Sequence, residues 1–367
     1  MQIFERIAGH GYEQVVFCHD GRTGLRAVIA IHSTRLGPAL GGTRFYPYES
    51  EADAVEDVLR LARGMTYKSA GAGLDLGGGK AVIIGNPATD KTEGLLRAYA
   101  RFVESLGGRY LTAEDVGTTQ ADMDLIRRET RHVTGVSRAL GGSGDPSEAT
   151  AYGVLHAMQA VAGRLWDSRD LAGRHIVVSG VGKVGYALCR HLVETRAHVT
   201  VSDIVPAAVE RALSAFGIDA VPPEKAHSVE CDIYSPCALG GVLNATTIPE
   251  LRCAAIVGSA NNQLAETADA DRLADIGVTY APDYIVNAGG VINIAEELVG
   301  YSRERAYGNI RRIAQTTTAV LETASADGTT TAAAADRLAE RRIDELSHVH
   351  QIRTRAIDRE PARGDRG

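Results

Sequence analysis

The sequence predicts a mixed α/β protein with two domains. Its 367 residues exceed the ~100–200 residues of a usual single domain, so we expect two hydrophobic cores. Strand and helix patterns alternate along most of the chain, which is typical of sheets covered by helices. The second half contains a glycine-rich turn between a strand and a helix. We therefore expect an N-terminal α/β domain and a doubly wound, dinucleotide-binding domain after it.

The change in composition at residues 140–147, LGGSGDPS, predicts a hinge between the two domains. We expect the first domain over residues 1–143 and the dinucleotide-binding domain over residues 144–329. The C-terminal segment, about 330–367, starts with an alanine-rich helix that we expect to pack back on the first domain. Its charged end after His350 is expected to fray.

The charges and the cysteines limit the class of protein. Lysine and arginine total 39 against 46 aspartates and glutamates, and the net charge of −7 argues against a nucleic-acid partner. No apolar run approaches the ~18–20 residues that span a bilayer, and the N-terminus does not resemble a secretory signal, so we expect a cytoplasmic protein with no membrane partner. The cysteines form no C-x-x-C pair, which favours free thiols over disulfides or a metal site: Cys18, Cys189, Cys231, Cys237 and Cys253.

The first domain is expected to begin with a β-branched strand over residues 25–31. Residues 32–48, interrupted by Gly-Pro and Gly-Gly, are expected to form a loop. A capping box and a helical stripe then predict a helix over residues 50–64, ended by a glycine. The remaining elements expected in this domain are a strand over 81–84, a helix over 95–106 and a strand over 110–114.

Residues 64–80, GMTYKSAGAGLDLGGGK, place two lysines among glycines and alanines. Lys68 and Lys80 could be solvated surface charges beside a glycine-rich turn. Alternatively, loss of water could lower an ammonium pKa and turn a lysine into an acid/base at neutral pH. A triphosphate-binding P-loop is excluded, because Leu74 replaces its first glycine and Ala81 replaces its Ser/Thr.

The second domain contains the strongest local motif. A strand over 176–179 leads into G-x-G-x-x-G, a helix, a second strand and an acidic residue. Glycines in that turn let a pyrophosphate approach the helix N-terminus, and the acid binds ribose hydroxyls but repels a 2′-phosphate. The motif therefore predicts NAD in preference to NADP. The cofactor-binding positions of this unit are Gly180, Gly182, Lys183, Val184, Gly185 and Asp203.

Further strands and helices alternate downstream, in the segments 231–244, 254–265 and 277–298. Each strand ends in small or amide residues, as expected where ligands bind at the carboxyl edge of a parallel sheet. A long helix at about 308–326 should cross back toward the first domain. The strand-end residues are Pro236, Asn261, Asn262, Asn287, Gly289 and Gly290.

Taken together, these motifs resemble the glutamate/leucine/phenylalanine/valine dehydrogenases, and within them most closely the valine and leucine enzymes. The resemblance extends from about Leu25 to Arg342. It implies NAD-dependent, reversible oxidative deamination of an L-amino acid to a 2-oxo acid and ammonium, in a homo-oligomer assembled through the N-terminal domain. The motifs are LGPALGGTRFY, GMTYKSAGAGLDLGGGKAVI, GGRYLTAEDVGTT, SGVGKVG, PCALGG, GSANNQLA and APDYIVNAGGVI.

The resemblance assigns three charged residues to the reaction. Lys68 would hold the substrate α-carboxylate, and Lys80 would act through water as general acid/base on the carbonyl or carbinolamine oxygen. Asp115 would take the proton from the α-ammonium, although this residue taken alone would be interpreted as a helix cap. Arginine could not replace Lys80, because a guanidinium does not lose its proton in proteins.

The same resemblance places uncharged residues around substrate and cofactor. Gly41, Gly42 and Met65 would line the substrate, and Asn262 would lie near its amine. The implied side-chain pocket is aliphatic, formed by Leu40, Ala113, Val291 and Ile294, and the further cofactor positions are Thr150, Asn261 and Asn287.

The aliphatic pocket argues against a dicarboxylate substrate and favours a branched side chain. A methylene is worth only about 1–3 kcal/mol in such a pocket, so valine, leucine and isoleucine stay unranked. Phenylalanine dehydrogenase is one alternative. A catalytically silent NAD-binding regulator is the other, because a fold alone does not fix a function.

Overall fold

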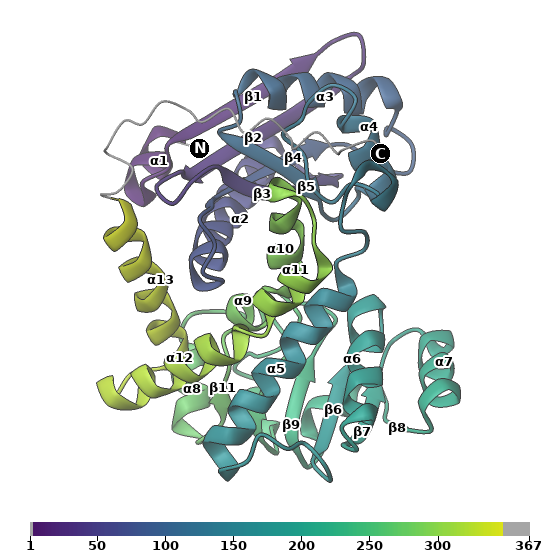
Figure 1. Cartoon of the computed structure of the whole chain (residues 1–367), viewed down its shortest axis with the longest axis vertical. Helices are drawn as coiled ribbons and strands as arrows, with labels where there is room; N and C mark the ends of the chain where they lie inside the picture. Colours follow the sequence, from purple (N-terminus) through teal and green to yellow (C-terminus); the bar gives the residue numbers. More distant parts are fainter. Residues whose placement is uncertain (1–2, 348–367) are drawn as a thin grey trace, which may run out of the picture.

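The computed structural model describes residues 3–347 and forms two sheets, one in each half of the molecule (Figure 1). The five strands of the first sheet have the order β1-β2-β4-β3-β5. β1 and β2 are antiparallel, as are β2 and β4, whereas β3 is parallel to both β4 and β5. These strands are β1 (Gln14–Asp20), β2 (Leu25–Ser33), β3 (Ala39–Tyr46), β4 (Gly77–Ile84) and β5 (Tyr110–Glu114).

Helices cover both faces of this first sheet. α2 (Glu51–Gly71) packs on one face through residues such as Val55 and Val58, which meet Val82. α3 (Glu93–Ser105) packs on the other face through Leu95 and Tyr99. Two shorter helices, α1 (Ile3–His10) and α4 (Gln120–Ile126), complete this half.

The second sheet has six parallel strands in the order β11-β10-β9-β6-β7-β8. Counted from its own first strand this is the order 3-2-1-4-5-6 of a Rossmann fold, so the predicted fold class is confirmed. The strands are β6 (His175–Ser179), β7 (His198–Ser202), β8 (Asp219–Ala220), β9 (Cys231–Pro236), β10 (Cys253–Ile256) and β11 (Thr279–Tyr280).

The second half has more helices than the sequence patterns predict. α5 (Ser147–Trp166), not expected as a helix, packs against α6 and α12. A 3₁₀ turn, η1 (Arg138–Leu140), precedes it, so no regular element covers the expected domain boundary at 143/144, which stays a prediction. The other helices are α6 (Lys183–Glu194), α7 (Pro206–Phe216), α8 (Asp269–Asp275), α9 (Asp283–Val286), α10 (Gly289–Ala295), α11 (Arg303–Ile310) and α12 (Ile313–Asp327), with 3₁₀ turns η2 (Pro223–Ser228), η3 (Ile248–Glu250) and η4 (Glu296–Val299).

Two predictions in the first half are wrong. The segment expected to be a loop contains the strand β3, and its glycines are there because the neighbouring backbones come very close. A Cβ on Gly41 would overlap the carbonyl oxygen of Gly79 on β4. The helix expected to end at Gly64 continues to Gly71, so Lys68 lies in its last turn and Lys80 lies within β4.

The prediction of one helix at about 308–326 is also wrong in detail. It is divided into α11 and α12, which stay on the Rossmann half. The helix that returns to the first half is α13 (Thr331–Ser347). Its Ala339 and Ile343 pack with Leu36 and Ala70, while Glu340 accepts a hydrogen bond from Tyr67 at 2.9 Å. The prediction for the tail after His350 lies outside the described residues.

Other sequence features appear as follows. Each of the five cysteines has a free thiol in the structure. Within residues 3–347, none of the helices has the length and apolar character needed to cross a membrane.

Candidate active site

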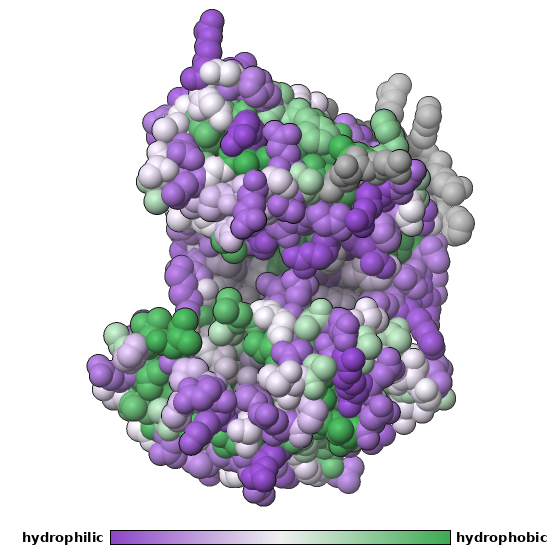
Figure 2. Space-filling view, turned by 180° about the vertical axis from the view of Figure 1, so that it is seen from behind, coloured by the Kyte–Doolittle hydropathy of each residue, from purple (hydrophilic) through white to green (hydrophobic). Residues whose placement is uncertain are grey.

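A cavity of about 520 Å³ lies between the two halves, and Figure 2 shows the hollow between them from behind. Its walls come from α2 and strands β3, β4 and β5 on one side, and from the ends of strands and helices of the Rossmann half on the other. All the residues predicted to react or to bind substrate line it, as does one predicted cofactor residue: Leu40, Gly41, Gly42, Met65, Lys68, Lys80, Ala113, Asp115, Asn261, Asn262, Val291 and Ile294.

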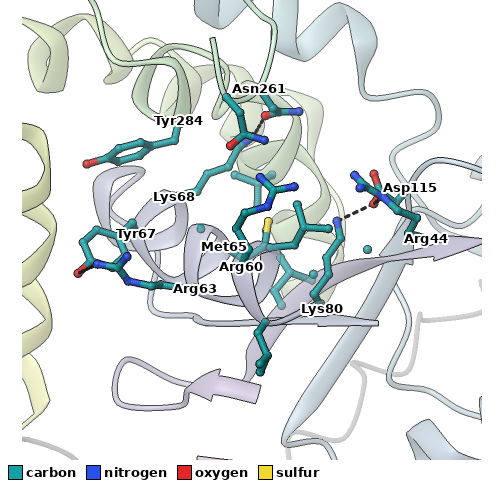
Figure 3. Close-up of a pocket in the computed structure, with 18 of the residues that line it drawn as sticks. Arg44, Arg60, Arg63, Met65, Tyr67, Lys68, Lys80, Asp115, Asn261 and Tyr284 are labelled. Atoms are coloured by element: carbon teal, nitrogen blue, oxygen red, sulfur yellow. Dashed lines mark hydrogen bonds and ion pairs between the residues drawn. The ribbon is translucent and has the colours of Figure 1, made fainter. Parts of the chain in front are cut away.

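Lys80 and Asp115 form an ion pair in this cavity, with 2.8 Å between Nζ and Oδ2 (Figure 3). Side chains alternate along β4, so Lys80 faces the cavity because Ala81 and Ile83 face the core under α3. Its side chain is only 8% exposed, which excludes the interpretation as a solvated surface charge. Asp115 follows the last residue of β5, at the carboxyl end of a parallel strand.

The charges around Asp115 keep it ionised. Burial acts to raise its pKa, but the ammonium of Lys80 and the guanidinium of Arg44 outweigh this effect, and the pKa lies below the usual aspartate value. A carboxylate with a lowered pKa is available as a proton acceptor at neutral pH.

Lys68 lies on the other side of the cavity, where it joins the two halves. Its Nζ donates to Oδ1 of Asn261 over 3.4 Å. Burial lowers the pKa of Lys68 to about 8, with Lys80 acting in the same direction and Asp283 and Asp115 against it. An ammonium whose hydrogen bond goes to a neutral amide keeps its charge available for an incoming carboxylate.

Glycines allow the strands to come close enough to form the cavity floor. A Cβ on Gly42 would lie 2.6 Å from the carbonyl oxygen of Glu114 and 2.8 Å from Cβ of Asp115. Together with Gly41 against β4, this glycine lets β3 lie between the strands that carry Lys80 and Asp115. A side chain at position 41 would collide with the backbone of Gly79, next to Lys80, and one at position 42 would collide with Glu114 and Asp115.

The predicted dinucleotide turn lies at the carboxyl end of β6. Gly180 has φ +105°, and a Cβ on Gly185 would overlap the carbonyl oxygen of Gly180, so both glycines serve the tight turn. A Cβ on Gly182 would meet nothing within 4 Å, which leaves open space at the N-terminus of α6. Asp203 accepts from the backbone N–H groups of Val181 and Val205, at 2.7 and 2.9 Å.

These residues fit a dinucleotide cofactor. Helix N–H groups at the start of α6 attract a pyrophosphate, and the oxygens of Asp203 have lone pairs left for ribose hydroxyls. Lys183 is paired with Asp145 over 2.8 Å. The cavity described above does not include this turn, so the predicted cofactor residues fall into two groups.

The remaining predicted cofactor positions, Asn261, Asn287 and Thr150, lie in the Rossmann half but outside the glycine turn. Nδ2 of Asn287 donates to Oδ1 of Asn261 over 2.9 Å, which ties it to the cavity wall. Thr150 lies on α5, where its hydroxyl donates to the carbonyl of Pro146 over 3.1 Å. A Cβ on Gly290 would lie 2.8 Å from that hydroxyl oxygen, so α5 and α10 meet closely at this point.

Sequence analysis missed an extended set of contacts behind Asp115. Nε of Arg44 lies 3.3 Å from Oδ2 of Asp115, and Nη1 of Arg44 lies 2.8 Å from Oδ2 of Asp57. Because residues 32–48 were interpreted as a loop, the alternation that puts Leu40, Gly42 and Arg44 on one face of β3 was not recognised. That alternation is the signal that could have found Arg44.

The chain is similar to known proteins over most of its length. The profile of the Glu/Leu/Phe/Val dehydrogenase dimerisation domain matches residues 12–132, and that of the Glutamate/Leucine/Phenylalanine/Valine dehydrogenase domain matches residues 141–211 and 206–350. The chain belongs to this dehydrogenase family. Its similarity to leucine dehydrogenase of Geobacillus stearothermophilus is 54% identity over 346 residues, which cover 94% of each chain.

Two further dehydrogenases are similar to this chain. Valine dehydrogenase of Streptomyces coelicolor is 54% identical over 340 residues, covering 91% of this chain and 93% of that protein. The crystal structure of L-tryptophan dehydrogenase from Nostoc punctiforme has 45% identity and a TM-score of 0.83, covering 94% of this chain and 99% of that one.

Membership in this dehydrogenase family confirms several expectations. The chain is an oxidoreductase of the amino-acid dehydrogenase kind, and the family implies a nicotinamide cofactor. The N-terminal match is to a domain described as a dimerisation domain, in agreement with the expected self-association.

Proposed function

We propose that the chain catalyses the NAD-dependent, reversible oxidative deamination of a branched-chain L-amino acid. The observation that carries this proposal is the buried Lys80–Asp115 ion pair, which shares one cavity with Lys68. The leucine and valine dehydrogenases among its relatives support the choice of substrate class. So does the aliphatic lining of the cavity by Leu40, Ala113, Val291 and Ile294.

The two ends of an amino acid meet different charges in this cavity. The α-carboxylate binds Lys68, which lies away from the ion pair and donates to an amide oxygen. The α-ammonium is directed to Asp115, which accepts one of its protons and leaves a neutral amine. Only a neutral amine has the lone pair needed to push electrons toward Cα as the C–H bond breaks.

The glycine turn at the start of α6 and Asp203 would hold a nicotinamide dinucleotide, which would supply the acceptor for the hydride that leaves Cα. The resulting iminium carbon is then attacked by water. Lys80, once it has given up its own proton, takes one proton from that water, which yields a carbinolamine. Asp115 then returns its proton to the carbinolamine nitrogen. The C–N bond breaks as the hydroxyl proton is lost and the carbonyl forms, and the released ammonia takes up a proton as ammonium. Asn261 and Asn262 line the cavity on the Rossmann side, where Asn261 accepts a hydrogen bond from Lys68.

NAD is proposed as the cofactor because of Asp203. Its carboxylate is held at the end of β7 by the two backbone N–H groups of Val181 and Val205. A fixed negative charge at this position accepts from a ribose 2′-hydroxyl and repels a 2′-phosphate. Location in the cytoplasm, inferred from the free cysteines, is part of the same proposal.

The test is NADH formation with L-leucine, L-valine, L-isoleucine, L-phenylalanine, L-tryptophan and L-glutamate, each with NAD and with NADP. We expect the highest kcat/KM with a branched aliphatic substrate and NAD. Faster reaction with an aromatic amino acid would reassign the substrate class. Folded protein that binds NAD and turns over none of the six would instead indicate a regulator.

A further inference from the structure

Arg44 is the second cation on the Asp115 carboxylate, beside Lys80. Its Nε approaches Oδ2 of Asp115 to 3.3 Å, the same oxygen that Lys80 contacts at 2.8 Å. Arg44 itself is 22% exposed at the side chain and lines the cavity. We propose that Arg44 is a positioning residue that orients Asp115 and holds it as a carboxylate until it accepts the proton of the substrate ammonium. This inference rests on the proposed function, because it concerns the proton acceptor of that reaction.

The guanidinium of Arg44 is itself held in place from α2. Nη1 of Arg44 lies 2.8 Å from Oδ2 of Asp57, and the hydroxyl of Tyr48 donates to that oxygen at 2.6 Å. Nη2 of Arg60 donates to the other oxygen of Asp57 at 2.8 Å. Asp57 is 15% exposed, so three donors meet one largely buried carboxylate. Arg44 therefore has little freedom to turn away from Asp115.

The planar fork of arginine suits this bridging position. Arg44 contacts one carboxylate through Nε and another through Nη1, so the two acids are held at a fixed separation. A lysine would supply a similar charge from a single nitrogen and could not keep the same spacing. The backbone of β3 and the helix α2 are thereby connected to the end of β5.

The electrostatic balance around Asp115 also depends on Arg44. The charged groups that face Asp115 are Lys80 from β4, Arg44 from β3, Glu114 from β5 and Lys68 from α2. Burial and the neighbouring Glu114 favour the protonated acid, whereas the cations favour the carboxylate. The pKa of Asp115 is lowered chiefly by Lys80 and then by Arg44, against the effect of burial.

The test is the pH profile of kcat/KM for oxidative deamination in the Arg44→Met variant. An opposite charge within about 4–6 Å shifts a carboxyl pKa by about 1–3 units, and partial exposure reduces this. We expect the acid limb of the profile to move up by about one pH unit. We also expect kcat to fall more than KM rises, while the Kd for NAD, measured by fluorescence titration, stays unchanged.

Two further variants separate charge from structure. Arg44→Lys keeps the charge and should restore most of the acid limb even if kcat stays low. Arg60 contacts Asp57 and not Asp115, so Arg60→Met removes a cation from the same network while keeping the contacts of Asp115. It should move the acid limb by less than half of the shift caused by Arg44→Met. Arg44→Gln supplies a second neutral variant if Arg44→Met does not fold.

The outcomes distinguish this inference from the proposed function. A folded, NAD-binding Arg44→Met or Arg44→Gln protein with an unmoved acid limb would overturn the role of Arg44. Equal limb shifts in Arg44→Lys and in the neutral variants would do the same, since charge would then be irrelevant. Wild-type protein without deaminating activity would instead overturn the proposed function.

Discussion

At the scale of single residues, the two lysines differ in what they contact. Lys80 binds a carboxylate directly, whereas Lys68 donates to the amide of Asn261. The geometry therefore suits Lys80 for proton transfer in company with Asp115 and Lys68 for holding a substrate anion. Both lysines lie in the same glycine-rich stretch of sequence, and that stretch alone does not show how their environments differ. The difference arises because Lys68 belongs to the helix α2 and Lys80 to the strand β4.

The first prediction separates these two roles by substitution. Lys80→Ala should lower kcat by about 10²–10⁴-fold, the usual contribution of a general acid/base, with little change in the Kd for NAD. Lys68→Ala should chiefly raise KM, by about 10–100-fold, because a charge-assisted hydrogen bond to the carboxylate is lost. Steady-state kinetics and fluorescence titration measure both. Small, equal effects would contradict the assignment.

The second prediction concerns pH. The pKa of Lys68 is lowered to about 8 in the protein without substrate, so its charge is present below that pH and lost above it. The Kd of 4-methylpentanoate, whose carboxylate does not titrate in this range, should be flat below pH 8 and rise about tenfold per pH unit above it. Calorimetry measures this. In Lys68→Met the dependence should vanish, and a flat wild-type profile up to pH 10 would refute the idea.

At the scale of secondary structure, strands and helices with clear periodicity were predictable, and glycine-rich ones were not. The helix expected over 95–106 is α3, and the strand expected over 176–179 is most of β6. β3 was missed and α2 was cut short because glycine was interpreted as a local turn signal. In the structure the glycines of β3 lie against the backbones of the neighbouring strands, which a single sequence does not show, whereas Gly64 is an ordinary position within α2.

The same error limited prediction of the site. The residues proposed to react were predicted because their motifs resemble those of a known family. Arg44 and Asp57 contribute through contacts between β3 and α2. The alternation along β3 could have placed Arg44 on the cavity face, but it does not show that Arg44 contacts Asp57 and Asp115. Long-range packing decides which charges face one another, so that part of the site needed coordinates.

The third prediction tests a glycine that sets the distance between α2 and β4. A Cβ on Gly78 would overlap the backbone of Thr66, so Gly78→Ala should lower the free energy of unfolding by about 1–3 kcal/mol through overpacking. Gly64 is the matched control, because it lies within α2 and a Cβ there meets nothing within 4 Å. Gly64→Ala should raise stability by about 0.5–1 kcal/mol. Denaturant unfolding measures both changes. If the two substitutions changed the free energy of unfolding in the same direction, this account would be contradicted.

At the scale of the whole molecule, the two halves share apolar packing and are also joined by specific polar contacts. Lys68 meets Asn261 across the cavity, and α13 returns from the Rossmann half to α2. A third connection is Glu297 in η4, which accepts from the backbone N–H groups of Gly135 and Ser143 at 2.9 and 2.8 Å. The hydroxyl of Ser143 donates to the same carboxylate at 2.6 Å. None of these pairings can be recognised from residue spacing.

The fourth prediction tests that connection. Glu297→Gln places an amide N–H₂ against groups that are themselves donors, which should lower the free energy of unfolding by about 1–3 kcal/mol. Thermal unfolding measured by circular dichroism checks this. Glu304→Gln, an exposed change on α11, serves as the control and should have almost no effect. Identical melting curves for the two variants would show that Glu297 does not hold the halves together.

The return of α13 also has a consequence for synthesis on the ribosome. A nascent chain that has emerged as far as Asp327 already contains both sheets and every side chain assigned here to the chemistry. It still lacks the helix α13, which supplies Asp336 to the cavity lining and Glu340 as the hydrogen-bond acceptor of Tyr67. The helix translated after both sheets therefore completes a wall to which α2 contributes, and a polypeptide that stops before α13 leaves that side of the cavity open.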